Sequence, residues 1–473
     1  MHILLISFHY PPDSDIGSVR PAAFVRSLRE WGHQVTVISS ALPLIESGPE
    51  PDVVRPGWFD LRYFKSVRPS RAAPTKEPIP ASANTTGAQI EKKPRTGWLR
   101  SILTPGSPLR RVVAAGRANV IELPDERGGW IPSATSAALR AAGTNGCDLV
   151  IASGPPFAAL VVAHRVAERL KIPWIADYRD LWSNGSYYSR SGTRQKLDAY
   201  IERRVLSNCT SAITVSLPLA DDLRRDFSIP VEEVLNGYDP ATVVPIRERE
   251  PLSSARLNLL YVGNNFYGKL RTPKDLLCAA RELRLTREDI CFHFLGSDPG
   301  LVEQFTTPTQ TGDLVRVHGA VPRERAIEMQ ARADALLLLM WNNPAEAGTY
   351  SGKIFEYIAV RRPIVICGYA DGVAANLVRE RGLGHVVNDQ RSAVGALSSL
   401  LASKPDNRLL PDLEPELRVG LSRAEQNLRL KAVIDNLVAT NGREVSQRDG
   451  SVPMSQGISS DLSVGPDPGA LDN

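Results

Sequence analysis

Short apolar runs recur along the chain, and segments of helical period lie between them. These runs cover residues 2–8, 33–40, 147–154, 173–182, 211–216, 257–263, 289–296, 313–319, 334–341 and 363–368. Apolar runs of this length, bounded by turn residues, are typical of buried parallel strands. The amphipathic segments between them predict connecting helices, as in repeated βαβ units. The pattern therefore predicts an α/β fold with two doubly wound halves facing a cleft.

The same pattern predicts how the chain is divided. Residues 1–235 are expected to form the first domain, with an insertion at about 42–120 where the strand and helix rhythm stops. An Asn-Gly turn follows at 236–237, and residues 236–415 are expected to form the second domain. A long terminal helix is predicted at 416–440. The tail, 441–473, rich in Gly, Pro and Ser near its end, is predicted to be disordered.

The insertion concentrates the positive charge of the chain. Residues 61–120 contain twelve Lys or Arg and two acids, whereas the whole chain has a net charge of +4, so the other residues are net negative. One interpretation is a solvated loop. The other is a docking surface for anionic lipid or a lipid-diphosphate acceptor, in which Trp98 lies at the interface. No motif of a nucleic-acid-binding fold accompanies the charge, so nucleic acid is not a predicted partner.

Composition places the chain among ordinary globular proteins. Its five cysteines have no metal-ligand spacing, and an odd number favours free thiols in a reducing compartment. The first residues, MHILLISFHY, have no basic region or cleavage-like site, so they predict a strand and not a signal peptide. No apolar run reaches the roughly 20 residues of a membrane span. We therefore expect a cytoplasmic protein that at most lies on the inner face of the membrane.

The strongest candidate site lies at residues 348–368, between the last two apolar runs of 334–341 and 363–368. A helix is predicted from Ser351 to Val360, and a helix that starts at the carboxyl end of a buried strand offers free N–H groups to an anion. Ser351 and Gly352 begin it, Lys353 adds a cation in its first turn, and Glu356 lies on the same face. This set suits a nucleoside diphosphate, with Glu356 at the ribose. The alternative is an ordinary i,i+3 surface pair of Lys353 and Glu356.

Two loops after strands of the first half supply further candidates. The loop 9–18 holds Gly17 and Ser18, and ligands of parallel sheets bind at such strand ends. The segment PWIADYRDLW at 173–182 holds Asp177 and Asp180, either of which is a candidate contact to an acceptor hydroxyl. The alternative for this segment is an Arg179–Asp180 pair that holds the loop. His9, beside the first loop, is interpreted as a packed or capping histidine.

Taken in order, these stretches resemble a family 4-type glycosyltransferase with the GT-B architecture. The stretches that carry the resemblance are SFHYPPDSDIGSVRPAAFVRSLREWGHQVTVIS, PWIADYRDLW, VEEVLNGYDP and SGKIFEYIAVRRPIV. The resemblance covers about 1–40 and 147–440. It implies two Rossmann-like domains and a terminal helix that packs back on the first. It also implies retaining, metal-independent transfer from a nucleotide sugar to a saccharide acceptor that we expect to be lipid-linked.

The resemblance also assigns residues, with departures. Glu356 matches the second Glu of the family's E-x7-E pattern, which holds the ribose, while the first position is Gly348. Glu346, two residues earlier, is a possible substitute. The family's loop arginine falls at Asn264, where Lys269 and Arg271 of the same loop are expected to supply positive charge. Gly17 matches the loop glycine that lets the backbone approach a phosphate. The usual Gly-x before the last donor-site strand is Arg361-Arg362.

Two other functions stay open at this stage. A nucleotide-sugar epimerase on the same architecture should carry paired acids and a histidine in the cleft. A catalytically weak nucleotide-sugar-binding scaffold is motivated by Gly348 and Asn264, which replace expected residues.

Overall fold

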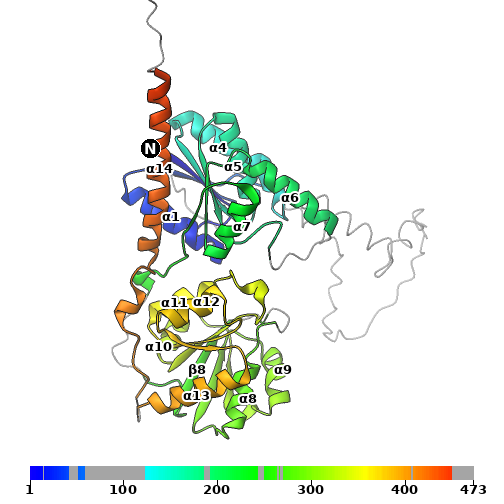
Figure 1. Ribbon diagram of the computed structural model, residues 1–473, viewed down its shortest axis with the longest axis vertical. Helices are drawn as coiled ribbons and strands as arrows, with labels where there is room; N and C mark the ends of the chain where they lie inside the picture. Colours follow the sequence, from blue (N-terminus) through cyan, green and yellow to red (C-terminus); the bar gives the residue numbers. More distant parts are fainter. Residues whose placement is uncertain are drawn as a thin grey trace, which may run out of the picture. The chain divides into compact units, whose positions relative to one another are not determined.

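The computed structural model describes residues 1–13, 15–41, 52–58, 123–185, 192–242, 250–263, 266, 270–405 and 408–449. These residues form two separate parallel sheets with helices packed on both faces (Figure 1). The predicted α/β class with two doubly wound, Rossmann-like halves is confirmed. The exact residues at which one domain gives way to the next stay a prediction.

The first sheet has the strand order β3-β2-β1-β4-β5-β6-β7, and all its pairs are parallel. Its strands are β1 (His2–Ser7), β2 (Gln34–Ile38), β3 (Val53–Val54), β4 (Leu149–Gly154), β5 (Trp174–Tyr178), β6 (Ser211–Thr214) and β7 (Val231–Glu233). Its helices are α1 (Val19–Glu30), α4 (Ile131–Asn145), α5 (Ala158–Leu170), α6 (Gly192–Leu206) and α7 (Leu217–Phe227). Trp130, Trp174 and Tyr178 are fully buried in the core between the sheet and α4 to α7.

The second sheet has the order β10-β9-β8-β11-β12-β13 and is also parallel. Its strands are β8 (Leu257–Val262), β9 (Ile290–Leu295), β10 (Val315–His318), β11 (Ala335–Leu339), β12 (Ile364–Cys367) and β13 (Gly384–Val387). Helices α8 (Lys274–Glu282), α9 (Pro299–Thr309) and α13 (Gln390–Ser403) enclose one core. Helices α10 (Arg323–Ala331), α11 (Gly352–Val360) and α12 (Val373–Glu380) enclose the other.

Each sheet reverses its strand order at one place, and this determines where a ligand can bind. The reversal lies between β1 and β4 in the first sheet and between β8 and β11 in the second. At such a switch point the loops that leave the two strands go to opposite faces and open a crevice at the carboxyl edge. The loops concerned are those after β1, β4, β8 and β11, and they include the predicted site segments.

Helix α9 and strands β3 and β7 were not anticipated. Helix α9 occupies a stretch that the pattern left without structure, although Asp298 caps it and Pro299 begins it. Strand β3 pairs with β2, so residues 53–54 belong to the sheet rather than to the insertion predicted at 42–120. A strand of two residues is too short to show a hydrophobic period.

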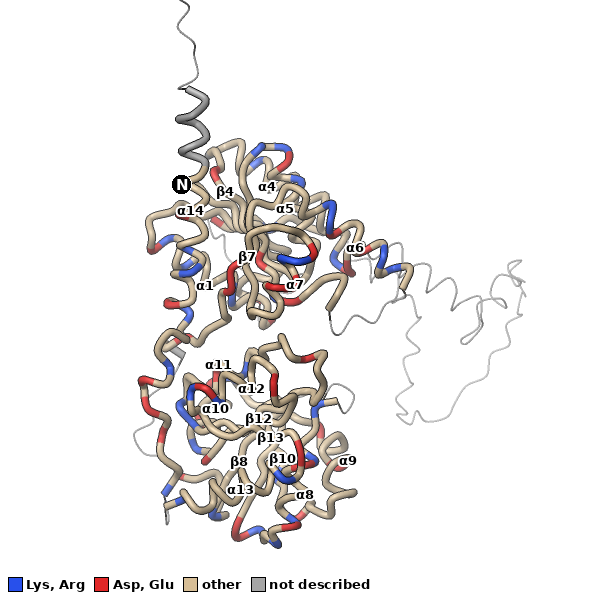
Figure 2. The backbone as a smooth tube through the Cα atoms, in the orientation of Figure 1, with Lys and Arg blue, Asp and Glu red and all other residues tan. Residues whose placement is uncertain are grey.

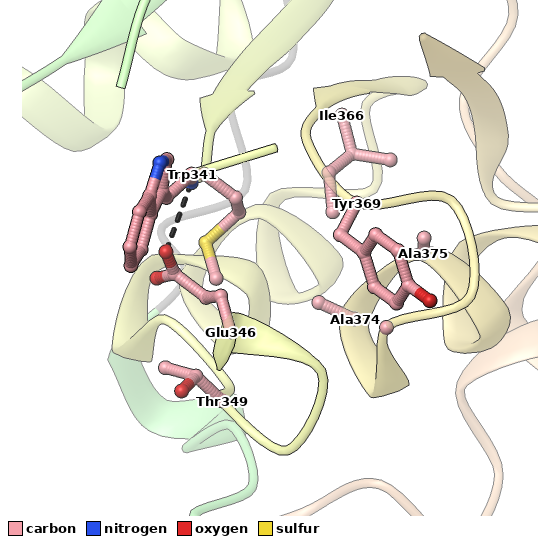
Figure 3. Close-up of a pocket in the computed structure, with 9 residues that line it drawn as sticks. Trp341, Glu346, Thr349, Ile366, Tyr369, Ala374 and Ala375 are labelled. Carbon is pink, nitrogen blue, oxygen red and sulfur yellow. Dashed lines mark hydrogen bonds between the residues drawn. The ribbon is translucent and has the colours of Figure 1, made fainter. Parts of the chain in front are cut away.

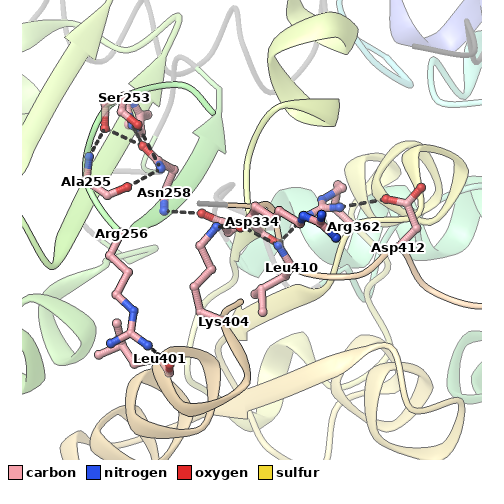
Figure 4. A network of polar contacts seen from close by, with 12 residues as sticks. Ser253, Ala255, Arg256, Asn258, Asp334, Arg362, Leu401, Lys404, Leu410 and Asp412 are labelled. Atoms are coloured by element: carbon pink, nitrogen blue, oxygen red, sulfur yellow. Dashed lines mark hydrogen bonds and ion pairs between the residues drawn. The ribbon is translucent and has the colours of Figure 1, made fainter. Parts of the chain in front are cut away.

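A buried polar network at the opposite edge of the second sheet explains one departure from the family pattern (Figure 4). Asp334 is fully buried and accepts hydrogen bonds from Lys404 Nζ at 2.7 Å and from the Leu410 amide at 3.0 Å. Arg362 is also buried and donates to the Asp334 carbonyl at 3.1 Å and to Asp412 at 2.7 Å. Arg362 is therefore a structural residue that ties the chain before β12 to the segment after α13.

Arg361 has a different local reason. It ends α11 with a φ of +64°, the left-handed conformation that usually favours glycine. Its Nε donates to the carbonyl of Leu413 at 2.7 Å. That bond offsets part of the cost of the backbone conformation, which is about 1–2 kcal/mol for a residue with a Cβ.

The last helix, α14 (Arg423–Asp449), starts in the compact unit Met1–Leu430 and ends in a second unit, Lys431–Asn473. In the first unit, Asn427 Nδ2 donates to the Ala23 carbonyl at 3.2 Å and to Ser27 Oγ at 2.8 Å, both on α1. The prediction that the terminal helix packs back on the first domain is confirmed. The helix continues to Asp449 instead of ending at 440, and the rest of the predicted tail lies outside the described residues.

Among the described residues, no helix combines the length and the apolar character needed to cross a membrane.

Candidate active site

Helix α11 starts where the sequence predicted, at the switch point of the second sheet. Ser351 is its N-cap residue, and its side chain makes no capping hydrogen bond to the helix. The buried side of α11, which includes Ile354, Phe355 and Ile358, packs into the core. This anchoring holds the first-turn amides at the carboxyl edge of the sheet, where an anion can accept from them.

Lys353 and Glu356 are half-buried on α11, but they do not form the predicted alternative, a surface ion pair. In the described part of the chain neither side chain has an ion pair or hydrogen bond. Burial lowers the pKa of Lys353, the charge of Arg271 lowers it further, and Glu356 partly opposes this. A partly desolvated cation that makes no hydrogen bond or ion pair to a described residue is suited to an anionic ligand.

The end of β8 leaves room for the Lys353 ammonium. A Cβ added to Gly263 would lie 3.2 Å from Lys353 Nζ and 2.7 Å from Tyr261 Oη. Any side chain at position 263 would therefore press on the lysine. Gly263 brings bare backbone to the switch point, which is the usual reason for glycine beside a phosphate.

Arg271 and Glu346 form a buried ion pair beside this helix. Arg271 Nη2 contacts Glu346 Oε1, and Glu346 Oε2 accepts from the Trp341 amide at 2.9 Å (Figure 3). Glu346 is almost fully buried, so it acts as the anchor that joins the β8–α8 loop to the end of β11. Much of the positive charge predicted for Arg271 is thus balanced by Glu346, whereas Lys353 has no ion pair among the described residues.

A small recess opens between these segments (Figure 3). Glu346 and Trp341 lie at one end and Tyr369 lies at the other. The lining residues are Met340, Trp341, Glu346, Thr349, Ile366, Tyr369, Gly372, Ala374 and Ala375.

Arg179 is the centre of the carboxyl edge of the first sheet. Its Nε donates to the Gly154 carbonyl at 3.2 Å, its Nη1 donates to the Gly17 carbonyl at 3.1 Å, and its Nη2 contacts the Pro155 carbonyl. Burial lowers its pKa and the charge of Arg20 lowers it further, while Asp177, Asp180 and Asp15 act in the opposite direction. Arg179 therefore joins the loops after β1, β4 and β5 through backbone carbonyls, and it is not held by Asp180 as the alternative interpretation supposed.

Gly17, in the first loop, lies beside the Arg179 guanidinium, whereas the sequence predicted that its backbone approaches a phosphate. A Cβ at Gly17 would lie 2.9 Å from Arg179 Nη1, so the glycine makes room for that guanidinium. Its amide donates to Asp15 Oδ1 at 2.7 Å, and Ser18 Oγ donates to the Asp15 carbonyl at 2.8 Å. A role of Gly17 and Ser18 at the donor stays a prediction. The structure agrees with a packed His9, because its Nδ1 lies 2.6 Å from Asp13 Oδ2.

The two candidate acids have opposite surroundings. Asp177 is fully buried in β5, where Arg20 Nε donates to both of its oxygens at 3.0 and 3.1 Å and Ser153 Oγ donates to Oδ2 at 2.7 Å. These contacts give Asp177 a structural surrounding that no acceptor hydroxyl can enter. Asp180, past the end of the strand, is exposed and has no hydrogen bond or ion pair to a described residue. Protein around its carboxyl still raises its pKa by desolvation, which Arg179 partly opposes.

Some predicted positions cannot be placed. Lys269, Asn264 and the basic segment 61–120 lie outside the described residues. Within the described residues, no group of three or more His, Cys, Asp or Glu side chains is arranged to hold a metal ion.

Sequence reasoning undervalued Arg179 and Glu346. Arg179 lies directly at a strand end between two acids, and that position was a usable signal for a hub at the carboxyl edge. Glu346 was considered only as a substitute for a sugar-binding acid, and its partner Arg271 lies 75 residues away, so no local pattern indicated the pair.

The comparisons with known proteins agree with this architecture. Residues 17–237 match the family described as the glycosyl transferase 4-like domain. No curated protein sequence matched the chain.

Solved structures share the fold at low sequence identity. One is the lipopolysaccharide outer core galactosyltransferase WaaB, at TM-score 0.54 and 12% identity, covering 92% of this chain and 99% of that one. Anabaena HepE, solved with UDP, has TM-score 0.52 and 10% identity, with 94% and 100% covered. A protein described as a UDP-N-acetylglucosamine 2-epimerase from Listeria monocytogenes has TM-score 0.50 and 11% identity, with 93% and 97% covered.

The fold alone is thus shared with an epimerase-like structure, whereas the family match over 17–237 selects glycosyl transfer. Residues 17–237 are therefore a glycosyl transferase 4-like domain, and the chain has the two-domain fold of the GT-B glycosyltransferases.

Proposed function

We propose that this glycosyltransferase moves a sugar from a nucleoside-diphosphate sugar to a lipid-linked saccharide, with retention of anomeric configuration and without a metal ion. The observation that carries the proposal is the donor-site helix α11. Its amino end lies at the switch point of the second sheet, and it carries Lys353 and Glu356, which have no partner among the described residues.

The positive charge at α11 matches the leaving group of the reaction. A nucleoside diphosphate gains negative charge as the glycosidic bond breaks, and fixed donors aimed at it lower the barrier. The amides of the first turn, the helix dipole and Lys353 supply such donors without a metal. Glu356 follows Lys353 by three residues and is assigned to the ribose hydroxyls, as the family pattern implies.

Asp180 is the residue assigned to the acceptor. It is exposed at the carboxyl edge of the first sheet, beside the loops that Arg179 joins. Its carboxylate is free to accept a hydrogen bond from an acceptor hydroxyl. Asp177 is left out of the proposed chemistry because Arg20 and Ser153 occupy its oxygens.

A nucleotide panel tests the donor. UDP, GDP and ADP are compared by thermal shift, since a ligand that binds only the native state raises the midpoint by mass action. UDP is the first probe because HepE, which shares the fold, was solved with it. One nucleotide should shift the midpoint, and Glu356→Ala should reduce that shift while leaving the midpoint of the free protein unchanged. If none of the three nucleotides binds, the scaffold alternative is favoured.

Two further measurements test the mechanism once an acceptor is found. The anomeric proton of the first product, read by NMR before mutarotation, should keep the donor configuration. Turnover should be unaffected by EDTA. An inverted product or a loss of turnover that Mg²⁺ or Mn²⁺ restores would contradict the corresponding part of the proposal.

The outer faces of α5 and α6 support an anionic membrane as the place where the acceptor is met. The exposed basic residues of α5, its C-cap and α6 are Arg165, Arg169, Lys171, Lys196, Arg203 and Arg204, and the exposed acid of these helices is Glu168. Figure 2 marks the basic positions along α6 in blue. Leu197 and Tyr200 are exposed on the same face of α6, at 38% and 68%. A basic face with protruding apolar side chains is suited to the surface of anionic lipid.

Vesicle binding tests this part. The full chain should sediment with vesicles containing phosphatidylglycerol and not with phosphatidylcholine vesicles. Leu197→Ser with Tyr200→Ser should weaken binding, and so should deletion of 61–120. Undiminished binding by both variants would remove the membrane proposal and leave the donor chemistry untouched. Peripheral attachment at the cytoplasmic side of the membrane is proposed on the same basis.

A further inference from the structure

Ser216, at the start of α7, reaches the loop that leads into the donor-site helix. It is fully buried, and its Oγ donates to the carbonyl of Gly348 at 2.6 Å. Ser216 is also the N-cap residue of α7, but its side chain makes no capping hydrogen bond. A serine in that position normally caps its own helix, a contact worth about 0.5–2 kcal/mol. Here its hydroxyl is directed to a residue 132 positions away.

Side chains of α7 lie close to Gly348, so a side chain there would require them to move. A Cβ added there would lie 2.5 Å from Leu219 Cδ1 and 3.3 Å from Pro218 Cβ, both on α7. The backbone of Gly348 is not in the left-handed region, so space rather than conformation requires the glycine. The residue that the family pattern expects there, a glutamate, could occupy the position only if the Leu219 side chain and Pro218 of α7 moved.

The next part of the same loop also faces the first domain. Burial raises the pKa of Tyr350, and the nearby carboxylate of Glu233, on β7, acts in the same direction. The Leu217 amide, at the start of α7, acts on the pKa of Glu233 in the lowering direction, so this carboxyl lies beside the start of that helix. Gly348 and Tyr350 thus lie against one surface, formed by the start of α7 and the end of β7.

The loop is short and firmly connected to the donor-site helix. The Thr349 amide donates to the Glu346 carbonyl at 3.0 Å, and the Val373 amide donates to the Ala347 carbonyl at 2.8 Å. Gly348 precedes Lys353 by five residues, so a displacement at Gly348 moves the amino end of α11.

We propose that Ser216 and Gly348 are positioning residues, through which the acceptor-side domain sets the placement of the donor-site helix, and that position 348 is glycine because α7 fills the space of a side chain. The role at the donor rests on the proposed function, whereas the contact itself does not.

Hydrogen exchange tests the contact without any nucleotide. In Gly348→Glu, amides of both 216–221 and 346–351 should exchange faster, by roughly three- to tenfold for the loss of about one net hydrogen bond. Ser216→Ala should change the same two segments in the same direction. Gly395→Ala, where an added Cβ meets nothing within 4 Å, is the matched control and should change neither. Faster exchange confined to 346–351 would show local strain and overturn the proposal.

A rescue variant separates this contact from general destabilisation. Gly348→Ala should increase exchange in both segments, and adding Leu219→Ala should return both toward the wild-type rates, because it removes the atom that the new Cβ meets. Additive effects of the two changes would contradict the proposal.

UDP titration of the same variants then tests the positioning role. If wild-type protein binds UDP, Gly348→Glu should weaken that binding and the Gly348→Ala/Leu219→Ala pair should restore it. UDP affinity unchanged in Gly348→Glu would overturn the positioning role. Absence of UDP binding by the wild type would count against the proposed donor and leave the exchange result valid.

Discussion

Replacing Lys353 by methionine should separate ligand binding from stability. The side chain is half-buried, its pKa is lowered by burial and by Arg271, and no described residue pairs with it. The charged form is thus disfavoured in the free protein, although Glu356 partly opposes this, and a bound anion would favour it. Methionine keeps the length and apolar stem of lysine and removes the ammonium.

The expected magnitude follows from the contact that is lost. A hydrogen bond to a charged partner contributes about 1.5–3 kcal/mol, which corresponds to a roughly 10- to 150-fold weaker Kd for the nucleoside diphosphate. The midpoint of the free variant should be equal to or above that of the wild type, since a desolvated cation has been removed. Binding and stability therefore move in opposite directions, as is common at functional sites.

The pH dependence of binding has a definite sign. A bound diphosphate favours the charged amine and raises its pKa from the lowered value of the free protein toward or above the ordinary 10.5. Affinity should thus fall as pH rises through the lowered pKa of the free protein. In Lys353→Met this part of the pH dependence should vanish.

Calorimetric titration of wild type, Lys353→Met and the control Lys274→Met measures these quantities. Lys274 is exposed at the start of α8, and its replacement should leave the Kd within about twofold of the wild type. A Lys353→Met protein that binds the nucleotide as tightly as the wild type would refute the assignment. A lower unfolding midpoint with an unchanged Kd would show that Lys353 is a structural residue.

Two other pairs of variants follow from the geometry. Asp180→Asn should lower turnover and leave nucleotide affinity unchanged. Because the pKa of Asp180 is raised, its carboxylate is protonated at a higher pH than that of an ordinary aspartate, and wild-type turnover should begin to fall at that higher pH as the solution is acidified. Retained turnover in the variant would exclude the role. Asp177→Ala should instead cost stability, about 3–5 kcal/mol for one partner of a buried pair, measured by denaturant unfolding. Arg362→Ala should lower the free energy of unfolding by a similar amount in the same measurement. Arg361→Gly should change it by less than about 1 kcal/mol, because the relieved backbone strain offsets the lost hydrogen bond to the Leu413 carbonyl. Equal losses for the two arginines would contradict this distinction.

The hydrophobic pattern by itself determined the α/β class, most strands of both sheets and the start of helix α11. These features depend on local periodicity, on turn residues and on caps, all of which are visible in a few consecutive residues. Helix α9 was within reach of the same reasoning through Asp298 and Pro299, and strand β3 was too short to show a period.

The tertiary structure alone decided which polar residues are available for chemistry. Asp177 and Asp180 lie three positions apart, yet one is held by Arg20 from helix α1 and the other is exposed past the strand. Arg271 appeared as a free cation until Glu346 was seen beside it. Gly348 appeared as a lost acid until Leu219 and Pro218 of α7 were seen beside it. In each case the deciding neighbour is distant in the sequence, and burial and pairing depend on which surfaces the folded chain brings together, a property that no local pattern encodes.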